Sequence, residues 1–194
     1  MRELCYYCTI SLDGYLADAE GSTSWMHGAP GEDYGFAEFY RGAVALLLGR
    51  KTYERMQDSG DYFPYADKPV YVFSRNADMR RAAPSVQIIS DTTPETFVAR
   101  LKLKDDGVGP GAGADPAGPL WLGGGSQLAS ALYAAGLIDE IVLHVQPIIL
   151  GGGLPFLAGA GLRDRGLELQ ECSRAPGGFV KLRYRTVKSW RSDL

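Results

Sequence analysis

The sequence predicts an α/β sandwich with a mostly parallel β-sheet and an antiparallel edge formed by its C-terminal strands. Two observations lead to this fold class. Short apolar runs alternate with segments of helical periodicity up to about residue 136. Beyond that point the chain shows strand patterns without an intervening helix, which is typical of a hairpin-like tail.

The first half of the chain supplies most of the expected parallel strands. The first helix carries Phe36, Phe39 and Tyr40 at helical spacing, and Gly42 can end it. A later helix has Thr93 as its N-cap and Pro94 at its first position. In order, we expect a strand at 3–11, a turn at Asp13-Gly14, a helix at 32–42, a strand at 43–49, a helix at 51–57, strands at 68–75 and 85–90, and a helix at 93–103.

The second half begins with residues 104–119, which are dense in glycine and proline. This composition predicts a mobile and dispensable surface loop within one domain, and not a linker between two domains. We then expect a strand at 120–122, a glycine turn and helix up to 137, a long strand at 138–150, and two strands within 167–187 joined at Pro176-Gly177-Gly178.

The length, net charge and hydropathy of the chain exclude several classes of protein. The 194 residues suffice for a single domain spanning 1–194, with a full hydrophobic core. The net charge is −3 and no basic stripe is visible, which argues against a nucleic-acid partner. No apolar run approaches the roughly 18–20 residues of a membrane span, and the N-terminus lacks the pattern of a signal peptide. We therefore expect a cytoplasmic protein that does not bind a membrane.

The cysteines do not predict a metal site. Cys5 and Cys8 have the C-x2-C spacing, but they lie in a predicted strand, where positions i and i+3 face opposite sides. Cys172 and the two histidines are far away in the sequence. Buried reduced thiols are the better interpretation, and no metal is expected.

Three predicted strands end on residues that suit an anionic ligand. Glycines let backbone N–H groups approach an anion, a helix N-terminus adds a favourable partial charge, and basic side chains add full charges. In open α/β sheets, ligands bind at the carboxyl ends of the strands. Each stretch alone is more often a flexible turn or a capped helix start, but their repetition favours a ligand with several phosphates, such as a dinucleotide. The stretches are Gly49-Arg50-Lys51-Thr52, Ser74-Arg75 and Gly123-Gly124-Gly125-Ser126.

The order of five motifs resembles the dihydrofolate-reductase-like superfamily, and more narrowly the single-domain relatives of the reductase half of the riboflavin-biosynthesis deaminase–reductase. The resemblance covers about residues 1–188, with 104–119 as an insertion, and implies a three-layer sandwich on a mixed sheet. The motifs are "TISLDGYLA", "LLLGRKTYE", "KPVYVFSR", "LWLGGGSQL" and "IDEIVLHVQPIILGGGLPF".

The resemblance implies NADPH as the cofactor and assigns a role to each strand end. Gly49, Arg50, Lys51 and Thr52 would hold the pyrophosphate from a helix N-terminus. Ser74 and Arg75 would hold the 2′-phosphate, and Gly123, Gly124, Gly125 and Ser126 would pass against the nicotinamide ribose and phosphates. The resemblance also implies a cis peptide bond between Gly123 and Gly124.

Two further positions bear on the substrate. Folate enzymes have an acidic, pterin-binding residue sixteen residues before the glycine of the glycine–arginine turn, which is Asp33 here. Asp33 is therefore the candidate catalytic residue, although acidic residues are also common in first helical turns. Where folate enzymes clamp the glutamate tail with arginine, this chain has Lys68, which cannot form the bidentate fork.

We therefore expect an NADPH-dependent reductase that transfers hydride to a small heterocycle, either pterin-like or like the pyrimidine of riboflavin biosynthesis. The deaminase half is absent, so the chain could supply only the reductive step. A non-catalytic nucleotide-binding protein is the alternative. A homodimer is expected in either case, because proteins of the resembling family commonly form one.

Overall fold

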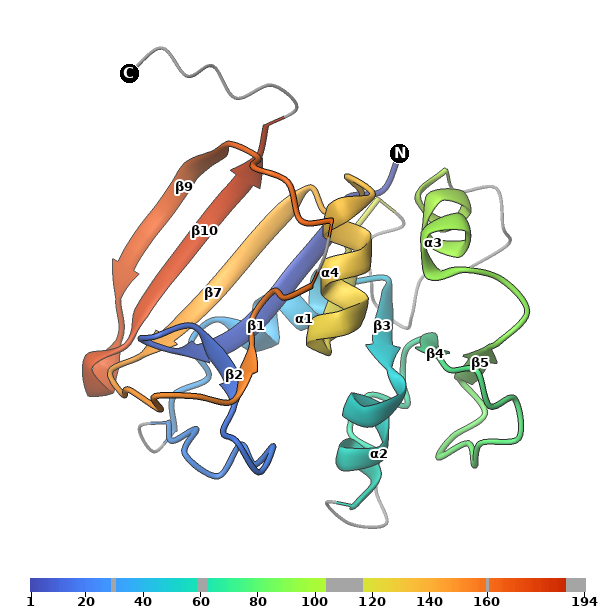
Figure 1. The fold of residues 1–194 in the computed structure, drawn as a ribbon, viewed down its shortest axis with the longest axis horizontal. Helices are drawn as coiled ribbons and strands as arrows, with labels where there is room; N and C mark the ends of the chain where they lie inside the picture. Colours follow the sequence, from blue (N-terminus) through green and yellow to red (C-terminus); the bar gives the residue numbers. More distant parts are fainter. Residues whose placement is uncertain (29–30, 59–62, 104–116, 160, 188–194) are drawn as a thin grey trace.

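The computed structural model describes residues 1–28, 31–58, 63–103, 117–159 and 161–187 (Figure 1). The strands are β1 (Leu4–Ser11), β2 (Tyr15–Ala17), β3 (Ala45–Gly49), β4 (Val70–Phe73), β5 (Val86–Ile89), β6 (Leu120–Gly124), β7 (Glu140–Gln146), β8 (Leu154–Pro155), β9 (Leu167–Arg174) and β10 (Val180–Thr186). The helices are α1 (Phe36–Gly42), α2 (Arg50–Asp58), α3 (Pro94–Lys102) and α4 (Ser126–Ala134). The expected loop at 104–119 falls mostly outside the described residues.

Eight strands form one mixed sheet in the order β5-β4-β3-β6-β1-β7-β10-β9. Neighbouring strands from β5 to β7 are parallel, whereas β10 is antiparallel to both β7 and β9. This confirms the predicted mostly parallel sheet with an antiparallel C-terminal edge. The short strands β2 and β8, which the sequence did not predict, pair with each other in a separate two-stranded sheet.

Helices cover the sheet on both faces, so the fold has three layers. Successive side chains of β1 point to opposite faces of the sheet and so reach both helical layers. Leu4 and Tyr6 belong to the core cluster that includes residues of α3 and α4. Cys5 and Tyr7 belong to the opposite cluster, which packs against α1 and α2. In Figure 1, α4 lies in front of the sheet and α1 behind it.

The first helix is shorter than predicted, because it begins at Phe36 and not at residue 32. Tyr34 and Gly35 both have left-handed backbone conformations, with φ of 55° and 80°, which a right-handed helix cannot contain. Strand β7 is also shorter than the predicted 138–150, because it ends at Gln146, just before Pro147. Proline lacks the N–H that the ladder would need there.

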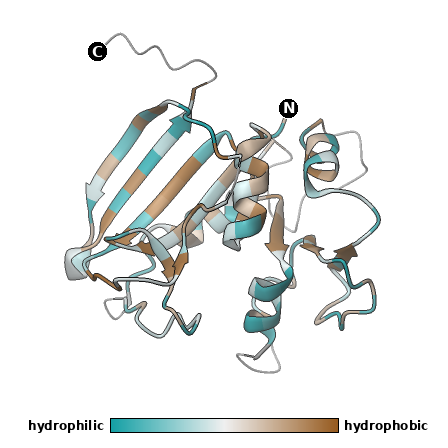
Figure 2. Ribbon diagram, in the orientation of Figure 1, coloured by the Kyte–Doolittle hydropathy of each residue, from teal (hydrophilic) through white to brown (hydrophobic). Residues whose placement is uncertain are grey.

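The C-terminal edge of the sheet lacks a helical cover on the α4 side within the described residues (Figure 1). The residues that point to this side from β7 and β10 are mostly apolar and half-buried, and Leu169 of β9 is 52% exposed. Figure 2 shows brown apolar bands running across these strands. The side chains concerned are Leu143, Val145, Val180, Leu182 and Tyr184. Among the described helices, none combines the length and the apolar character that crossing a bilayer demands.

Candidate cofactor cleft and the residues around it

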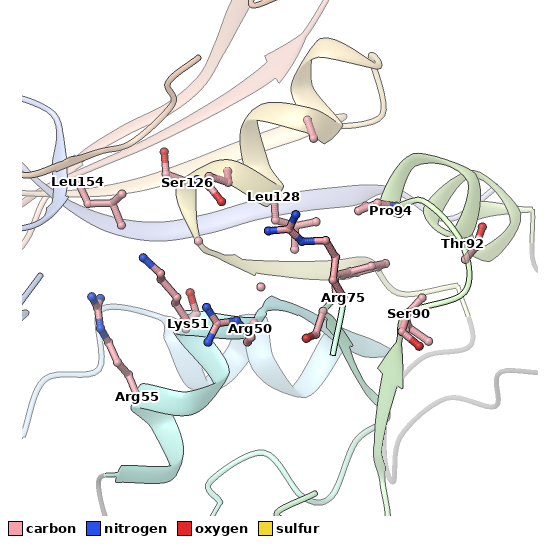
Figure 3. Close-up of a pocket in the computed structure, with 18 residues that line it drawn as sticks. Arg50, Lys51, Arg55, Arg75, Ser90, Thr92, Pro94, Ser126, Leu128 and Leu154 are labelled. Atoms are coloured by element: carbon pink, nitrogen blue, oxygen red, sulfur yellow. The ribbon is translucent and has the colours of Figure 1, made fainter. Parts of the chain in front are cut away.

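A cleft of about 410 Å³ opens at the carboxyl ends of β3, β4, β5 and β6 (Figure 3). The sequence-predicted residues that line it are Gly49, Arg50, Lys51, Thr52, Ser74, Arg75, Gly125 and Ser126. All three predicted strand ends therefore meet in one cavity, because parallel strands bring their carboxyl ends to the same edge. Gly123 and Gly124 are not among the lining residues.

Two glycine turns pack against each other at the floor of the cleft. Strand β3 ends at Gly49 and α2 begins at the next residue, so the free N–H groups of the first turn of α2 lie at the cleft. A Cβ on Gly49 would lie 3.3 Å from the backbone nitrogen of Gly125. A Cβ on Gly125 would lie 3.0 Å from Thr52 Oγ1. Side chains at either position would separate the turns, so the glycines keep both helix N-termini close together.

The cis peptide bond lies one residue later than predicted. It joins Gly124 to Gly125, not Gly123 to Gly124. Gly123 is still part of the β-sheet, where β3 and β6 shift register between Leu47 and Leu48. A Cβ on Gly123 would lie 2.9 Å from Leu48 Cδ2, so this glycine serves the packing of the core. The chain reverses only after Gly124, which has a φ of 104°.

The cleft carries an excess of positive charge. Arg50, Lys51, Arg55 and Arg75 line it, and its described lining contains no acidic residue. Arg50 pairs with Glu54 at 2.8 Å one helical turn away, and both side chains are nearly half-exposed. Figure 3 shows Arg50, Lys51 and Arg75 reaching into the space between α2 and α4. Such a surface attracts an anionic ligand.

The remaining lining gives the cleft an apolar wall that sequence reasoning missed. It combines side chains from β4, β5, α3, α4 and β8, which are far apart in the sequence. No local pattern marks them, because they come from separate elements: Phe73, Ile89 and Leu128 are buried core residues, whereas the others are only partly buried. These residues are Phe73, Ile89, Pro94, Leu128, Ala131 and Leu154.

Asp33 is not part of this cleft. Its exposed carboxylate accepts hydrogen bonds from the backbone nitrogens of Gly35 at 3.0 Å and Ala37 at 2.9 Å. These bonds stabilise the charged form and hold the pKa of Asp33 below its ordinary value. In this geometry, Asp33 fixes the turn that leads into α1. Its predicted role toward a substrate stays a prediction.

Lys68 is buried and has local partners. It is only 2% exposed, and its Nζ donates to the carbonyl of Arg41 at 3.4 Å. The same atom lies 4.9 Å from the centre of the Tyr40 ring, which is a cation–π distance. Burial lowers the pKa of Lys68. Because its ammonium group already has partners inside the fold, Lys68 is poorly placed to clamp the tail of a substrate.

Cys5, Cys8 and Cys172 are all free thiols. Burial raises the pKa of Cys8 to about 12, so this thiol stays protonated. Within the part of the chain that the structure describes, no group of three or more His, Cys, Asp or Glu side chains is arranged to hold a metal ion.

Comparison with known proteins agrees with the resemblance in sequence. The family model described as the RibD C-terminal domain matches residues 2–181. YwjB of Bacillus subtilis (strain 168) is 33% identical over 156 residues, which cover 80% of this chain and 82% of YwjB.

Solved structures share the fold. A protein from Shewanella sp. PV-4, whose name links it to riboflavin biosynthesis, is similar with a TM-score of 0.77 and 24% identity, over 97% of this chain and 100% of its own. Dihydrofolate reductase from Enterococcus faecalis, complexed with NADP(H), has a TM-score of 0.61 and 16% identity, over 95% and 96% of the two chains. The sequence and the fold together place this chain in the RibD C-terminal domain family.

Proposed function

We propose that the protein is an NADPH-dependent reductase that transfers hydride to a small heterocyclic substrate. The observation that carries this proposal is the cleft itself. Two glycine turns, the N-termini of two helices and four basic side chains converge on one cavity at the carboxyl ends of parallel strands. That combination suits a dinucleotide with several phosphates.

The residues of the cleft fit NADPH part by part. The first turn of α2, with Arg50, Lys51 and Thr52, would hold the pyrophosphate. Ser74 and Arg75 at the end of β4 would hold the 2′-phosphate, and Gly125 and Ser126, which end the glycine turn, would support the nicotinamide half. When bound, NADPH would supply the hydride, while these residues bind and orient it. The NADP(H) complex of the E. faecalis enzyme, which has the same fold, supports this assignment.

Lys68 bears on the choice of substrate. Its ammonium group is enclosed between Tyr40 and the Arg41 carbonyl, so it offers no free charge to a carboxylate. Loss of a bidentate arginine clamp removes roughly 1–3 kcal/mol of tail binding, or about 5- to 150-fold in affinity. We therefore expect a compact pterin-like or pyrimidine-like ring to be a better substrate than dihydrofolate.

A nucleotide-binding homodimer without turnover is the second candidate. The exposed position of Asp33 favours it, because a carboxylate committed to backbone N–H groups is a poor proton donor. The half-exposed apolar face of β7, β10 and β9 favours self-association with a second copy, whose identical face would cover it. Size-exclusion chromatography with light scattering tests the dimer: Leu182→Lys should yield monomers, whereas a wild-type monomer would contradict it.

The decisive experiment separates cofactor binding from turnover. NADPH binding is titrated by the quenching of protein fluorescence, and NADPH oxidation is then followed with dihydrofolate, the ribosylamino-pyrimidine of riboflavin biosynthesis, and simple imines. Binding with turnover of a ring substrate supports the reductase. Tight NADPH binding without reduction of any of these compounds favours the non-catalytic alternative, and absence of NADPH binding contradicts both.

A further inference from the structure

Tyr53 is a fully buried residue that directly follows the cleft-lining turn from Gly49 to Thr52. It is 0% exposed, and the residue before it, Thr52, lines the cavity. Its ring packs against Phe63 with ring centres 5.6 Å apart, in the core cluster on the α1 and α2 side of the sheet. A buried tyrosine normally directs its hydroxyl group to a specific partner, so the partners of Tyr53 indicate what this hydroxyl does.

The hydroxyl group of Tyr53 joins α2 to the loop that follows β4. Its oxygen accepts a hydrogen bond from the backbone N–H of Ala82 at 2.7 Å, and it donates to the Arg80 carbonyl at 3.2 Å. Gln57, one turn later on α2, donates from Nε2 to the Tyr53 oxygen at 2.8 Å and to the Arg80 carbonyl at 3.3 Å. The hydroxyl therefore donates once and accepts twice within the fold.

The same loop carries Arg75 into the cleft. Ser74 and Arg75 come directly after β4, and both line the cavity. Two side chains then shape the loop, because Asn76 N donates to Ser74 Oγ and Asp78 N donates to Asn76 Oδ1, both at 3.0 Å. These local turns lead the chain from the cleft to the point where Tyr53 holds it.

Arg75 depends on this loop for its position. Its side chain is exposed, and among the described residues no hydrogen bond or ion pair restrains the guanidinium group. Residues 75–78 are all exposed, so core packing contributes little to holding this stretch. The place of the Arg75 charge relative to the cleft is therefore set by the backbone of the loop and by the hydrogen bonds that anchor it.

We propose that Tyr53 is a positioning residue that sets the distance between the two phosphate-binding parts of the cleft, and with it the selectivity for a 2′-phosphate. Tyr53 belongs to the first turn of α2, which would hold the pyrophosphate, and its hydroxyl fixes the loop that bears Arg75. Charge-assisted hydrogen bonds depend steeply on distance and direction, so a small displacement of the loop would weaken the contact of Arg75 with the 2′-phosphate. The inference rests on the proposed function, since it concerns the cofactor of that reductase.

The two nicotinamide cofactors separate this role from simple support of the fold. NADPH and NADH share the pyrophosphate, and only NADPH carries the 2′-phosphate. A general loosening of α2 would weaken the binding of both cofactors, whereas displacement of the Arg75 loop would weaken the binding of NADPH alone. The ratio of the two dissociation constants is therefore a readout that a purely structural role would leave unchanged.

Tyr53→Phe keeps the buried ring and removes the hydroxyl group. The contact with Phe63 remains, and Met79 and Ala83 still pack the loop against the core cluster, so the variant should fold. Fluorescence titrations with the two cofactors should show the preference for NADPH lowered by roughly 3- to 10-fold, which corresponds to one hydrogen bond, with little change in the affinity for NADH.

Tyr6→Phe is the matched control. The hydroxyl of Tyr6 is also buried, but it donates to the Phe156 carbonyl at 3.2 Å in the core cluster on the other face of the sheet. This variant should lower the melting temperature and keep the preference for NADPH. The double variant Tyr53→Phe/Arg75→Ala tests the route of the effect: once the guanidinium group is gone, the hydroxyl should no longer matter for the preference, so the two effects should not add.

Each result has a definite meaning. An unchanged preference in Tyr53→Phe, equal weakening of both cofactors, or additive effects in the double variant would overturn the inference. If the wild type prefers NADPH and Tyr53→Phe behaves in the same way, the proposed reductase stands and only the role of Tyr53 is wrong. A wild type that does not bind NADPH would contradict the proposed function itself, and the inference would fail with it.

Discussion

The cofactor cleft and a buried polar patch, formed by Tyr7, Trp25 and His144, are built in opposite ways. The cleft uses charged, exposed groups in short stretches, each within a few residues of a strand end, such as Gly49 to Thr52. The buried polar patch uses neutral, buried groups from three distant segments of the chain. The cleft therefore suits an anionic ligand, because it offers fixed charges and free N–H groups, whereas the second region keeps a few buried polar atoms without hydrogen-bond partners among the described residues.

The largest effect is expected at Gly153, which packs against the end of β2 and precedes Leu154 of the cleft. The β2–β8 pair joins the segment after β1 to Leu154, which lines the cleft. Gly153 has a φ of 135°, and a Cβ there would lie 2.1 Å from the Ala17 carbonyl oxygen. Backbone strain and overpacking together should lower the free energy of unfolding in Gly153→Ala by about 3 kcal/mol or more.

Gly151→Ala is the control for that substitution. Gly151 also has a positive φ, at 72°, but a Cβ there meets nothing within 4 Å. It should therefore cost only about 1–2 kcal/mol, the price of the left-handed conformation. Chemical denaturation of both variants gives the comparison, and equal losses would show that the contact with Ala17 is unimportant.

The second effect concerns acid stability and belongs to His144 in the buried polar patch. The folded-state pKa of His144, about 4, lies below its ordinary value of 6.5, because burial and Lys181 disfavour the charged form. Between these values the unfolded chain binds more protons, so the free energy of unfolding falls as the pH is lowered. The contribution reaches about 3 kcal/mol below pH 4, at 1.36 kcal/mol per unit of pKa.

His144→Leu should remove this part of the pH dependence. Urea denaturation of the wild type and the variant at intervals from pH 7 to pH 4 measures it. The wild-type curve should fall more steeply between pH 6.5 and 4 than the curve of the variant. Parallel curves would mean that another group, and not His144, controls acid stability in this range.

The same contrast explains what the sequence could predict. The order of strands and helices, the mixed sheet and most of the cleft follow from local patterns, since a strand end and the next helical turn are neighbours in the chain. The buried polar patch depends on pairing between β1 and β7, which places Thr9 opposite His144. The early start predicted for α1 failed because Tyr34 and Gly35 adopt left-handed conformations that no helical periodicity reveals.

A smaller effect is expected on the preference of the protein for NADPH over NADH. Ser74 and Arg75 at the end of β4 can make one or two charge-assisted hydrogen bonds to a 2′-phosphate. At roughly 1.5–3 kcal/mol each, they should favour NADPH over NADH by about tenfold or more. Arg75→Ala should remove most of that preference, whereas Arg100→Ala on α3 should keep it. Equal wild-type affinity for the two cofactors in fluorescence titrations would rule this assignment out.

The smallest effect on cofactor binding is expected at Asp33, which the sequence assigned to catalysis. Asp33→Asn should slow turnover and leave NADPH affinity unchanged, because the side chain lies outside the cleft. The structure offers a competing cause, since Asn can accept with only one oxygen where the carboxylate accepts from both Gly35 and Ala37. Asp33→Ser separates the two causes, because serine can accept the hydrogen bond of a helix start but carries no charge. If serine restores the melting temperature but not the rate, the carboxylate acts on the substrate. If it restores both, Asp33 only positions the turn into α1, and its predicted role toward a substrate is wrong.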